Sequence, residues 1–459
     1  MDAPVLTRAK PQRPHQLSKD KAEDNGDALG ILLRVFYTLE RAGIPYCVLH
    51  GYEDFSQGII ASDVDCLIGK GPTARELLAL FHRNRDFIGA DIVRSLSFYF
   101  VFAGRTNNGP FFLALDFARN YDVGDLPLYD GEDVLASRRR YSQFYVPAAD
   151  VEFGCLLTRA VAKQKLSAER AHTLTRFFSR DSDSCTMHAT RHFSGANAKL
   201  VEAAARCGNW DPVRERLSEL RAELRQSAIA RRPTRFIVNK FYGFAGRVQR
   251  LLRPDGISVV FLGPDGAGKS SVIDRIGLKL AAVFPRWVCW GIVPGLNAIF
   301  RRGKRSTAEP HGLPPRSLTV SLLRLAYWFA YYTFERLALR TVLARSTLVL
   351  FDRHFIDILV DQKRYRYGGP VWMLHLLGWF IPKPDIVILL DAPTEVLQSR
   401  KQEVSFETTE HQRKAYLDLI TALPNGFVAD ASDSRERVVN VVSEIILNWL
   451  ADRSRRTTR

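Results

Sequence analysis

A glycine-rich loop in the second half of the chain has the composition and spacing of a phosphate-binding site. Residues 263–270 read Gly-Pro-Asp-Gly-Ala-Gly-Lys-Ser between an apolar, strand-like run and a segment of helical spacing. Glycines let backbone N–H groups curl around phosphate oxygens, and the helix N-terminus adds the positive end of its dipole. We therefore expect this loop to bind nucleotide phosphates through Gly263, Asp265, Gly266, Ala267, Gly268, Lys269, Ser270 and Ser271.

Lys269 and Ser270 carry the chemistry that such a loop needs. The Lys269 ammonium would reach the terminal phosphates of ATP, and the Ser270 hydroxyl would coordinate Mg²⁺. A P-loop also needs an acidic residue at the end of a neighbouring strand to position the metal. The apolar run Thr347 to Phe351 ends in Asp352-Arg353, so Asp352 is the second expected Mg²⁺ ligand.

The elements around these residues predict an α/β domain over residues 256–452. Ile257 to Leu262, Thr347 to Phe351 and Ile386 to Leu390 are short, β-branched apolar runs that predict buried strands. Pro393 to Tyr416 is charged and predicts a helix. Strands that alternate with helices favour a doubly wound parallel sheet.

The order and spacing of these motifs resemble the thymidylate kinase family, from Gly256 to Leu450. The resemblance implies an ATP- and Mg²⁺-dependent nucleoside monophosphate kinase, with a dimer as the family's usual assembly. It also implies that Asp352 positions Mg²⁺ and that Arg353 holds the acceptor phosphate. The family's basic lid would correspond to Arg400 and Lys401, which together with Lys269 would neutralise the transferring phosphoryl group.

The segments that would read the nucleoside depart from that family. Trp290 to Gly295 stands where the family has Arg-Glu-Pro-Gly, and Tyr327 to Tyr332 stands where it has a nucleotide-binding arginine. A basic and aromatic run, Lys363 to Arg366, follows the Asp-Arg strand. The phosphate-handling residues are kept, so we expect ATP as donor and leave the acceptor open among nucleotides, sugars and sugar phosphates.

Residues 28–228 contain a second set of carboxylates that could handle phosphate. Asp63 and Asp65 lie on one side of a predicted strand, and Asp116 lies inside a further apolar strand that runs from Phe111 to Phe117, so the three could share Mg²⁺. With the preceding Gly51, this pattern resembles the nucleotidyltransferase superfamily and implies an α+β domain. That superfamily has Gly-Ser or Gly-Gly where this chain has Gly51-Tyr52, and a tyrosine there would crowd a triphosphate. Catalysis, nucleotide sensing and a structural role all stay open.

Positive charge is concentrated between and after these domains. Lys and Arg outnumber Asp and Glu by 65 to 49, for a formal charge of +16. Residues 229–255 form a basic linker and 453–459 a basic tail, while the polar residues 1–27 predict disorder. If residues 237–251 are helical, an apolar stripe forms that packs the two domains together, our favoured interpretation, or contacts an anionic membrane. No motif predicts specific nucleic-acid binding.

The remaining features favour a cytoplasmic protein. No signal sequence is recognised, and the apolar stretches Leu318 to Phe334 and Val371 to Pro382 fall short of the roughly 20 residues of a spanning helix. Six cysteines without paired spacing predict free thiols. His50, His354 and His375 are expected to be packed or solvent-facing.

Two functions follow from these observations. The first is an ATP-dependent phosphotransferase joined to a nucleotidyltransferase-like domain, a fusion whose resemblances suggest surface-polysaccharide synthesis. The alternative is a nucleotide-gated interaction protein in which ATP binding is a switch. Asp352-Arg353 favours the enzyme, because a switch has less need of an arginine that holds an acceptor.

Overall fold

The computed structural model describes residues 22–57, 60, 63–106, 109–290, 314–402 and 404–458. The chain divides into two compact units. The first, the N-terminal unit, comprises the described residues from Ala22 to Gly246 and from Leu450 onward. The second, the C-terminal unit, comprises the described residues between Arg247 and Trp449.

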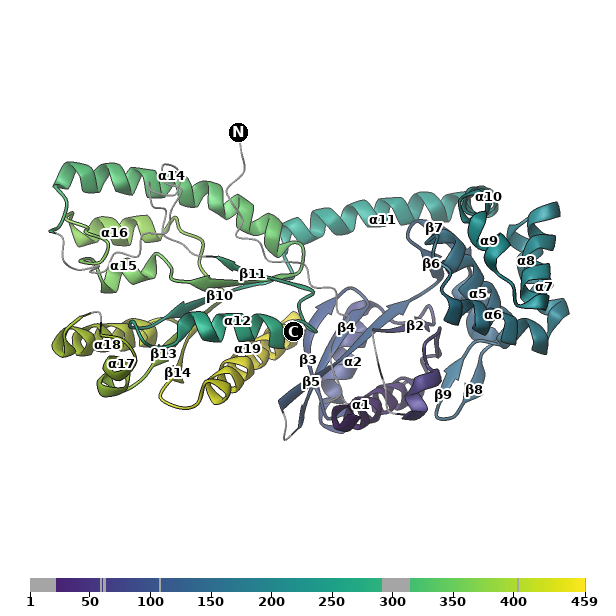
Figure 1. Ribbon diagram of the computed structural model, residues 1–459, viewed down its shortest axis with the longest axis horizontal. Helices are drawn as coiled ribbons and strands as arrows, with labels where there is room; N and C mark the ends of the chain where they lie inside the picture. Colours follow the sequence, from purple (N-terminus) through teal and green to yellow (C-terminus); the bar gives the residue numbers. More distant parts are fainter. Residues whose placement is uncertain are drawn as a thin grey trace. The chain divides into compact units, whose positions relative to one another are not determined.

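The C-terminal unit is built on a five-stranded sheet in which every neighbouring pair is parallel (Figure 1). The strand order is β11-β12-β10-β13-β14, so the strand before the glycine-rich loop is central. All six residues of that strand are buried, as its apolar sequence predicts. The expected parallel sheet is therefore present, with β10 (Ile257–Leu262), β11 (Arg286–Trp290), β12 (Thr347–Asp352), β13 (Ile386–Asp391) and β14 (Gly426–Asp430).

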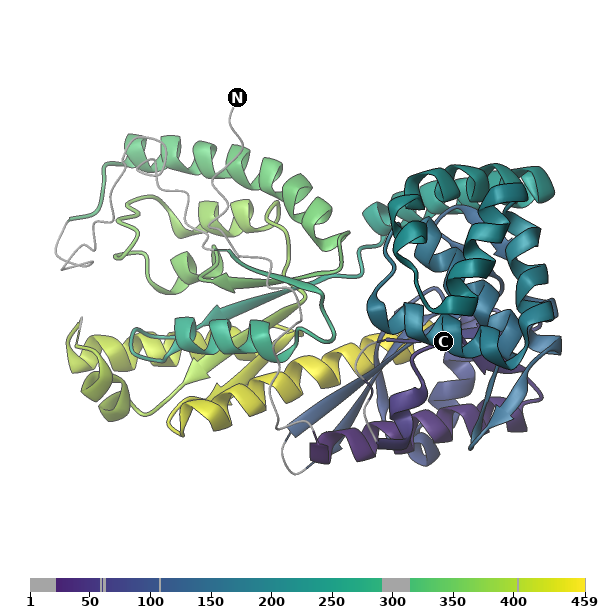
Figure 2. The ribbon, with the colours of Figure 1, turned by 45° about the vertical axis from the view of Figure 1, so that its right-hand side comes forward.

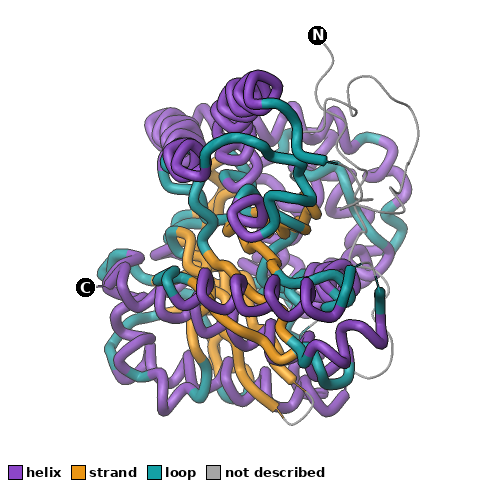
Figure 3. The backbone as a smooth tube through the Cα atoms, turned by 90° about the vertical axis from the view of Figure 1, so that its left-hand side faces the viewer, coloured by secondary structure: helices purple, strands orange, loops and turns teal. Residues whose placement is uncertain are grey.

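Helices cover both faces of this sheet, as Figure 3 shows. One face packs on a cluster that contains buried residues of α14 (Leu318–Leu343), α15 (Ile356–Val360), α16 (Val371–Gly378) and α18 (Phe406–Thr421). On the other side, α12 (Lys269–Lys279) and α19 (Arg435–Thr458) lie side by side (Figures 1 and 2). Lys279 of α12 donates a hydrogen bond to Asn440 of α19.

The single helix expected between Pro393 and Tyr416 is two helices, and that prediction was wrong. The first, α17, spans Thr394–Arg400, and α18 begins at Phe406. The side chain of Ser405 accepts a hydrogen bond from the backbone N–H of Thr408, which caps α18 and makes Ser405 a helix start.

The N-terminal unit contains a mixed five-stranded sheet in the order β1-β2-β5-β4-β3. Its strands are β1 (Tyr46–Val48), β2 (Val64–Ile68), β3 (Asp91–Leu96), β4 (Tyr99–Thr106) and β5 (Gly109–Ala118). Only β2 and β5 pair in parallel, and the other neighbours are antiparallel. One core joins the sheet to α1 (Ala22–Arg41) and α2 (Ala74–Arg83).

A helical layer completes this unit on the side of β1 and β2. Cys47, Leu49 and Leu67 share a buried cluster with these helices and with two short strands. The elements of this layer are β6 (Tyr121–Val123), β7 (Leu126–Tyr129), α4 (Gly131–Ala136), α5 (Ala149–Ala162), α6 (Ala168–Arg180), α7 (Ser182–His192), α8 (Gly195–Cys207), α9 (Asp211–Glu215) and α10 (Leu217–Arg231). The hairpin of β8 (Arg139–Tyr141) and β9 (Phe144–Val146) packs on the core of the sheet instead. The short helix α3 (Arg85–Ile88) follows α2.

Helical structure reaches into segments that were expected to be tails or linker. Residues 1–21 lie outside the described part of the chain, and α1 begins at Ala22. The basic linker carries a helix, α11 (Pro233–Leu252), so the conditional prediction of a helix there is confirmed. The final residues continue α19 to Thr458, and the buried apolar residues of this helix extend to Leu450 and Ala451. None of the helices in the described ranges is long and apolar enough to cross a membrane.

Candidate functional site

The glycine-rich loop follows β10 and turns into α12, as a phosphate cradle requires. Gly268, with φ of 83°, is the residue that caps the start of α12 in the left-handed region. Gly266 has φ of 87°, and a Cβ there would lie 2.8 Å from the carbonyl oxygen of Leu397. Both positions therefore require glycine.

Lys269 and Ser270 occupy the mouth of this loop. Lys269 is buried, and its Nζ donates to the carbonyl oxygens of Gly263 at 2.6 Å and Pro264 at 2.9 Å. Burial, and then the nearby Arg353, lowers the pKa of Lys269 from its ordinary value. A phosphate group entering the loop would replace the two carbonyl partners with charged oxygens, which an ammonium group binds more strongly.

The two residues expected to hold Mg²⁺ are in direct contact. The Ser270 hydroxyl donates to Oδ2 of Asp352 at 2.9 Å, although 82 positions separate them in sequence. Parallel pairing of β10 with β12 places Asp352 opposite Phe261, next to the loop. A hydroxyl and a carboxylate are the hard oxygen ligands that Mg²⁺ prefers, so the residues present fit the ion.

Arg353 lies beside the same loop and shares a partner with a second arginine. Its guanidinium donates to Oδ1 of Asp265 at 2.9 Å, and Arg364 donates to Oδ2 of the same carboxylate. Arg353 has φ of 87°, a left-handed conformation that is strained for a side chain with a Cβ and is typical of functional sites. Sequence reasoning noted the basic run Lys363 to Arg366 but gave Arg364 no role, because its partner is 99 residues away.

A buried carboxylate supports the turn after Arg353. Asp357 accepts hydrogen bonds from the backbone N–H of His354 at 3.1 Å and from the hydroxyl of Tyr416 at 2.9 Å. His354 is itself packed inside the unit, as expected, and burial lowers its pKa to about 4. Burial therefore favours the neutral form of this imidazole near pH 7.

The two expected lid cations have different surroundings. Arg400 donates to the carbonyl oxygens of Ala431 at 2.7 Å and Ser432 at 3.3 Å, so its guanidinium binds the loop after β14. Lys401 lies against the glycine-rich loop, since a Cβ on Gly266 would be 3.5 Å from Lys401 Cβ. Of the two, Lys401 is the one beside the phosphate cradle.

Two segments expected to contact the acceptor are only partly described. Residues 291–295, which replace the family's Arg-Glu-Pro-Gly, lie outside the described residues apart from the preceding Trp290. The side chains of Tyr331 and Tyr332 are likewise outside them. Trp290 stacks on Phe351 of β12 at 6.0 Å between ring centroids.

The three carboxylates of the N-terminal unit lie on or next to the paired strands β2 and β5. Parallel pairing sets Asp65 directly opposite Asp116, and Asp63 immediately precedes β2. Burial, followed by the charges of Asp65 and Asp63, raises the pKa of Asp116 to about 6. The hydroxyl of Tyr99 donates to Asp63 at 3.3 Å.

Two basic side chains of the same unit already contact Asp65. Its Oδ2 lies 3.2 Å from His50 Nε2 and 3.3 Å from the Arg159 guanidinium. Burial alone would raise the pKa of Asp65, but His50 and Arg159 outweigh it and lower that pKa. Within the described ranges, no three His, Cys, Asp or Glu side chains converge so that they could hold a metal ion. The carboxylates suit Mg²⁺ chemically but, in this arrangement, do not fit it.

Sequence reasoning missed both of these contacts. It treated His50 as a packed or solvent-facing residue, whereas its ring contacts Asp65. The position of His50 directly before Gly51, at the end of the first strand, was the available signal. Arg159 lies on α5 and gave no signal at all.

The tyrosine after Gly51 does not crowd this site. Tyr52 is buried in the core shared by the sheet and α1, and its hydroxyl donates to Oε2 of Glu152 at 2.7 Å. The side chain is therefore directed into the protein rather than into solvent above the turn. The crowding expected from the Gly51-Tyr52 sequence is not observed.

Comparison with known proteins finds similarity over part of the chain. A thymidylate kinase of Xanthomonas oryzae pv. oryzae is 28% identical over 216 residues, which cover 44% of this chain and 88% of that protein. Those of Bifidobacterium longum subsp. infantis and Staphylococcus haemolyticus are 28% and 27% identical, covering 43% and 42% of this chain. No family model matches the chain.

Among solved structures, the thymidylate kinase of Ehrlichia chaffeensis aligns with 41% of this chain and 98% of its own, at 17% identity and a TM-score of 0.31. The sequence similarity to these thymidylate kinases agrees with the parallel sheet and the loop geometry described above. The chain therefore contains a thymidylate kinase-like domain that accounts for about 43% of its length.

Proposed function

We propose that the C-terminal unit is an ATP- and Mg²⁺-dependent phosphotransferase. One observation carries this proposal: the Ser270 hydroxyl and the Asp352 carboxylate, from separate elements, meet at 2.9 Å beside the glycine-rich loop. Two oxygen ligands at the mouth of a phosphate cradle are what a bound Mg²⁺–nucleotide needs.

Each residue of the site has a distinct part in the proposed reaction. Backbone N–H groups of the loop and Lys269 hold the donor phosphates, while Ser270 and Asp352 would hold Mg²⁺, which neutralises the developing charge. Lys401 would approach the transferring group from the side of Gly266. These groups position and neutralise; where the attacking group is an ionised phosphate oxygen, the reaction releases no proton and requires no proton-transferring side chain.

The acceptor we propose carries an anionic group, held by Arg353 and Arg364. In the described structure both guanidinium groups bind Asp265, whose carboxylate has the same charge and a similar fork of oxygens. An acceptor phosphate would compete with this carboxylate for the two arginines. Nucleotides and sugar phosphates both meet this requirement, and neutral sugars do not.

For the N-terminal unit we propose a nucleotidyltransferase-like fold, supported by Asp65 and Asp116 on adjacent parallel strands. Asp63, Asp65 and Asp116 would hold a cation only if Asp65 left Arg159 and His50, so we derive no metal-dependent step here. Titration of the whole protein with Mn²⁺ tests this point, using the wild type, Asp116→Asn and Arg159→Ala. If the wild type binds Mn²⁺ and Asp116→Asn abolishes that binding, the catalytic interpretation of this unit is restored.

The kinase proposal is tested by incubating the whole protein with labelled ATP, Mg²⁺ and panels of nucleoside monophosphates, sugars and sugar phosphates. We expect label on a phosphorylated acceptor, with no transfer when Lys269→Ala replaces the wild type. Slow hydrolysis of ATP that no acceptor accelerates would instead favour the nucleotide-gated switch. No ATP binding at all would refute both.

A further inference from the structure

Helix α11 presents a set of large apolar side chains to solvent. None of its residues, Pro233–Leu252, is buried. Ile237 and Phe241 are each 65% exposed and Phe244 is 62% exposed. The same spacing continues to Val248 and Leu251, which are also exposed, so an apolar stripe runs the length of the helix.

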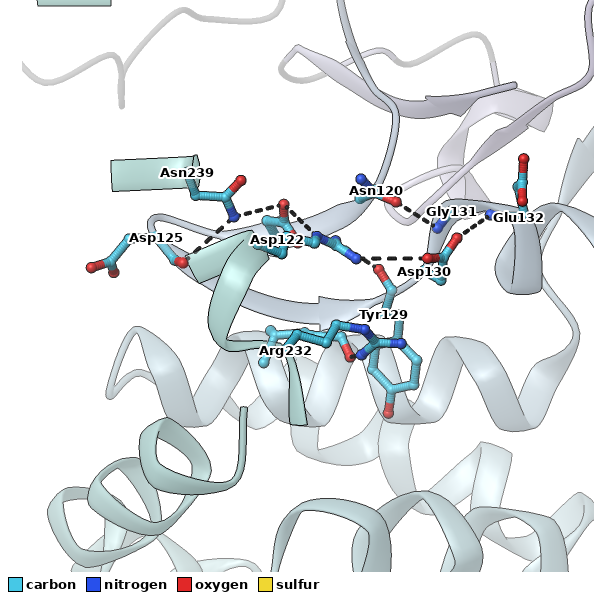
Figure 4. Close-up of polar contacts among 11 residues, drawn as sticks. Asn120, Asp122, Asp125, Tyr129, Asp130, Gly131, Glu132, Arg232 and Asn239 are labelled. Carbon is cyan, nitrogen blue, oxygen red and sulfur yellow. Dashed lines mark hydrogen bonds and ion pairs between the residues drawn. The ribbon is translucent and has the colours of Figure 1, made fainter. Parts of the chain in front are cut away.

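The opposite side of α11 is fastened to the hairpin β6–β7 of the N-terminal unit (Figure 4). Arg232, the residue just before α11, donates to the carbonyl oxygen of Leu128 at 2.9 Å, and Asn239 donates to the Asp122 carboxylate at 3.0 Å. Between them, Arg235 donates to Asp122 and, at 2.9 Å, to the carbonyl oxygen of Tyr129.

These bonds decide which way the stripe faces. At about 100° per residue, the centre of the stripe lies about 180° around the helix from the anchoring residues Arg235 and Asn239. The hairpin therefore holds the polar side of α11, and Ile237, Phe241 and Phe244 are directed away from it. This arrangement differs from a core-facing helix, whose apolar side would face its own domain.

The charges of α11 indicate which kind of surface the apolar stripe can bind. The helix contains no Asp or Glu, and Lys240 and Arg247 lie on its exposed surface near the edge of the stripe. Basic side chains beside exposed aromatic ones are typical of helices that lie in the interface of an anionic bilayer. A second copy of α11 would bring like charges together, which disfavours pairing of the stripe with itself.

We propose that α11 is a membrane-docking helix, with Ile237, Phe241 and Phe244 inserted among the lipids of an anionic surface and Lys240 and Arg247 at their headgroups. The anchor to β6–β7 would hold the N-terminal unit at that surface. This proposal is independent of the kinase reaction, since no residue of α11 belongs to the site described above.

Flotation of the intact protein with vesicles tests the proposal. We expect flotation with phosphatidylserine–phosphatidylcholine vesicles at low salt and none with phosphatidylcholine alone. The pair Phe241→Ser and Phe244→Ser should abolish flotation, whereas Met187→Ser, which alters an apolar residue of α7 that is 66% exposed, should not. Neutralising Lys240→Gln and Arg247→Gln together should lower the partition coefficient about 30-fold, since each cation contributes about a factor of five at such a surface.

Several outcomes would overturn this inference. The wild type could remain soluble with anionic vesicles, or the phenylalanine pair could float as well as the wild type. A sedimentation shift that depends on Phe241 and Phe244, without flotation, would assign the stripe to a second copy. Circular dichroism of each variant separates loss of docking from loss of folding, which we do not expect because the substituted side chains are exposed.

Discussion

Replacing Glu152 by glutamine should stabilise the N-terminal unit at alkaline pH. Glu152 lies on α5 with its side chain fully buried, and its only recorded hydrogen bond among the described residues comes from the Tyr52 hydroxyl at 2.7 Å. Burial raises the pKa of Glu152 from 4.5 to about 8. Ionisation of this carboxyl therefore opposes folding, and glutamine has the same shape without the charge.

The size and sign of the effect follow from that pKa. The folded state binds the Glu152 proton more tightly than the unfolded chain, so stability is complete below pH 4.5 and declines as the pH rises toward 8. The two pKa values differ by 8 − 4.5 = 3.5 units. At about 1.4 kcal/mol per unit, the ceiling is about 5 kcal/mol. We expect Glu152→Gln to gain at least about 2 kcal/mol over the wild type between pH 5 and pH 8.5.

Hydrogen exchange, followed by mass spectrometry on peptides of α5, measures the difference in stability between Glu152→Gln and the wild type within the N-terminal unit. Comparing variant and wild type at the same pH cancels the pH dependence of the intrinsic exchange rate. The exposed residue Glu215 provides the control, and Glu215→Gln should leave protection unchanged at every pH. Equal protection of the Glu152 variant and the wild type at pH 8.5, or a difference that does not vary with pH, would refute the reasoning.

Three further predictions concern the proposed kinase site. Lys269→Ala should lower kcat by about 10³ with unchanged circular dichroism, because it removes a charge from the transferring phosphates; near-normal steady-state turnover would contradict this. Arg364→Gln should raise the KM of the acceptor about 10- to 100-fold and leave the KM of ATP unchanged, since it removes a charged hydrogen-bond donor; a change confined to ATP would place Arg364 in the donor site. Thymidine monophosphate should be a poor acceptor, because Trp290–Gly295 and Tyr331 replace the residues that read the nucleotide; a kcat/KM above about 10⁴ M⁻¹s⁻¹ would show otherwise.

Features encoded in adjacent residues could be predicted from the sequence. The buried strand Ile257–Leu262 has the expected bounds, and the strands that begin at Thr347 and Ile386 each extend one residue further than expected. The glycine-rich loop is likewise a contiguous motif, so its turn into α12 follows from local conformational preference. The break before Phe406 was missed because a single capping serine decides it.

Contacts between distant residues could be predicted only where the sequence motifs also indicated which strands are neighbours. The meeting of Ser270 with Asp352 could be expected, since both motifs end neighbouring parallel strands. The pairing of Asp65 with Asp116 could be expected on the same ground. In each case the residue type and its place in an apolar strand or directly after one carried the information.

The sequence by itself determined the parallel sheet, the phosphate cradle and the basic, apolar-striped character of α11. Only the tertiary structure decided that Arg159 and His50 bind Asp65, and that Arg364 joins Arg353 on Asp265. Strand and helix signals are periodic in adjacent residues, because local backbone geometry sets which side chains share a face. An ion pair has no such period, since it forms wherever the packing of whole elements happens to bring two charges within reach.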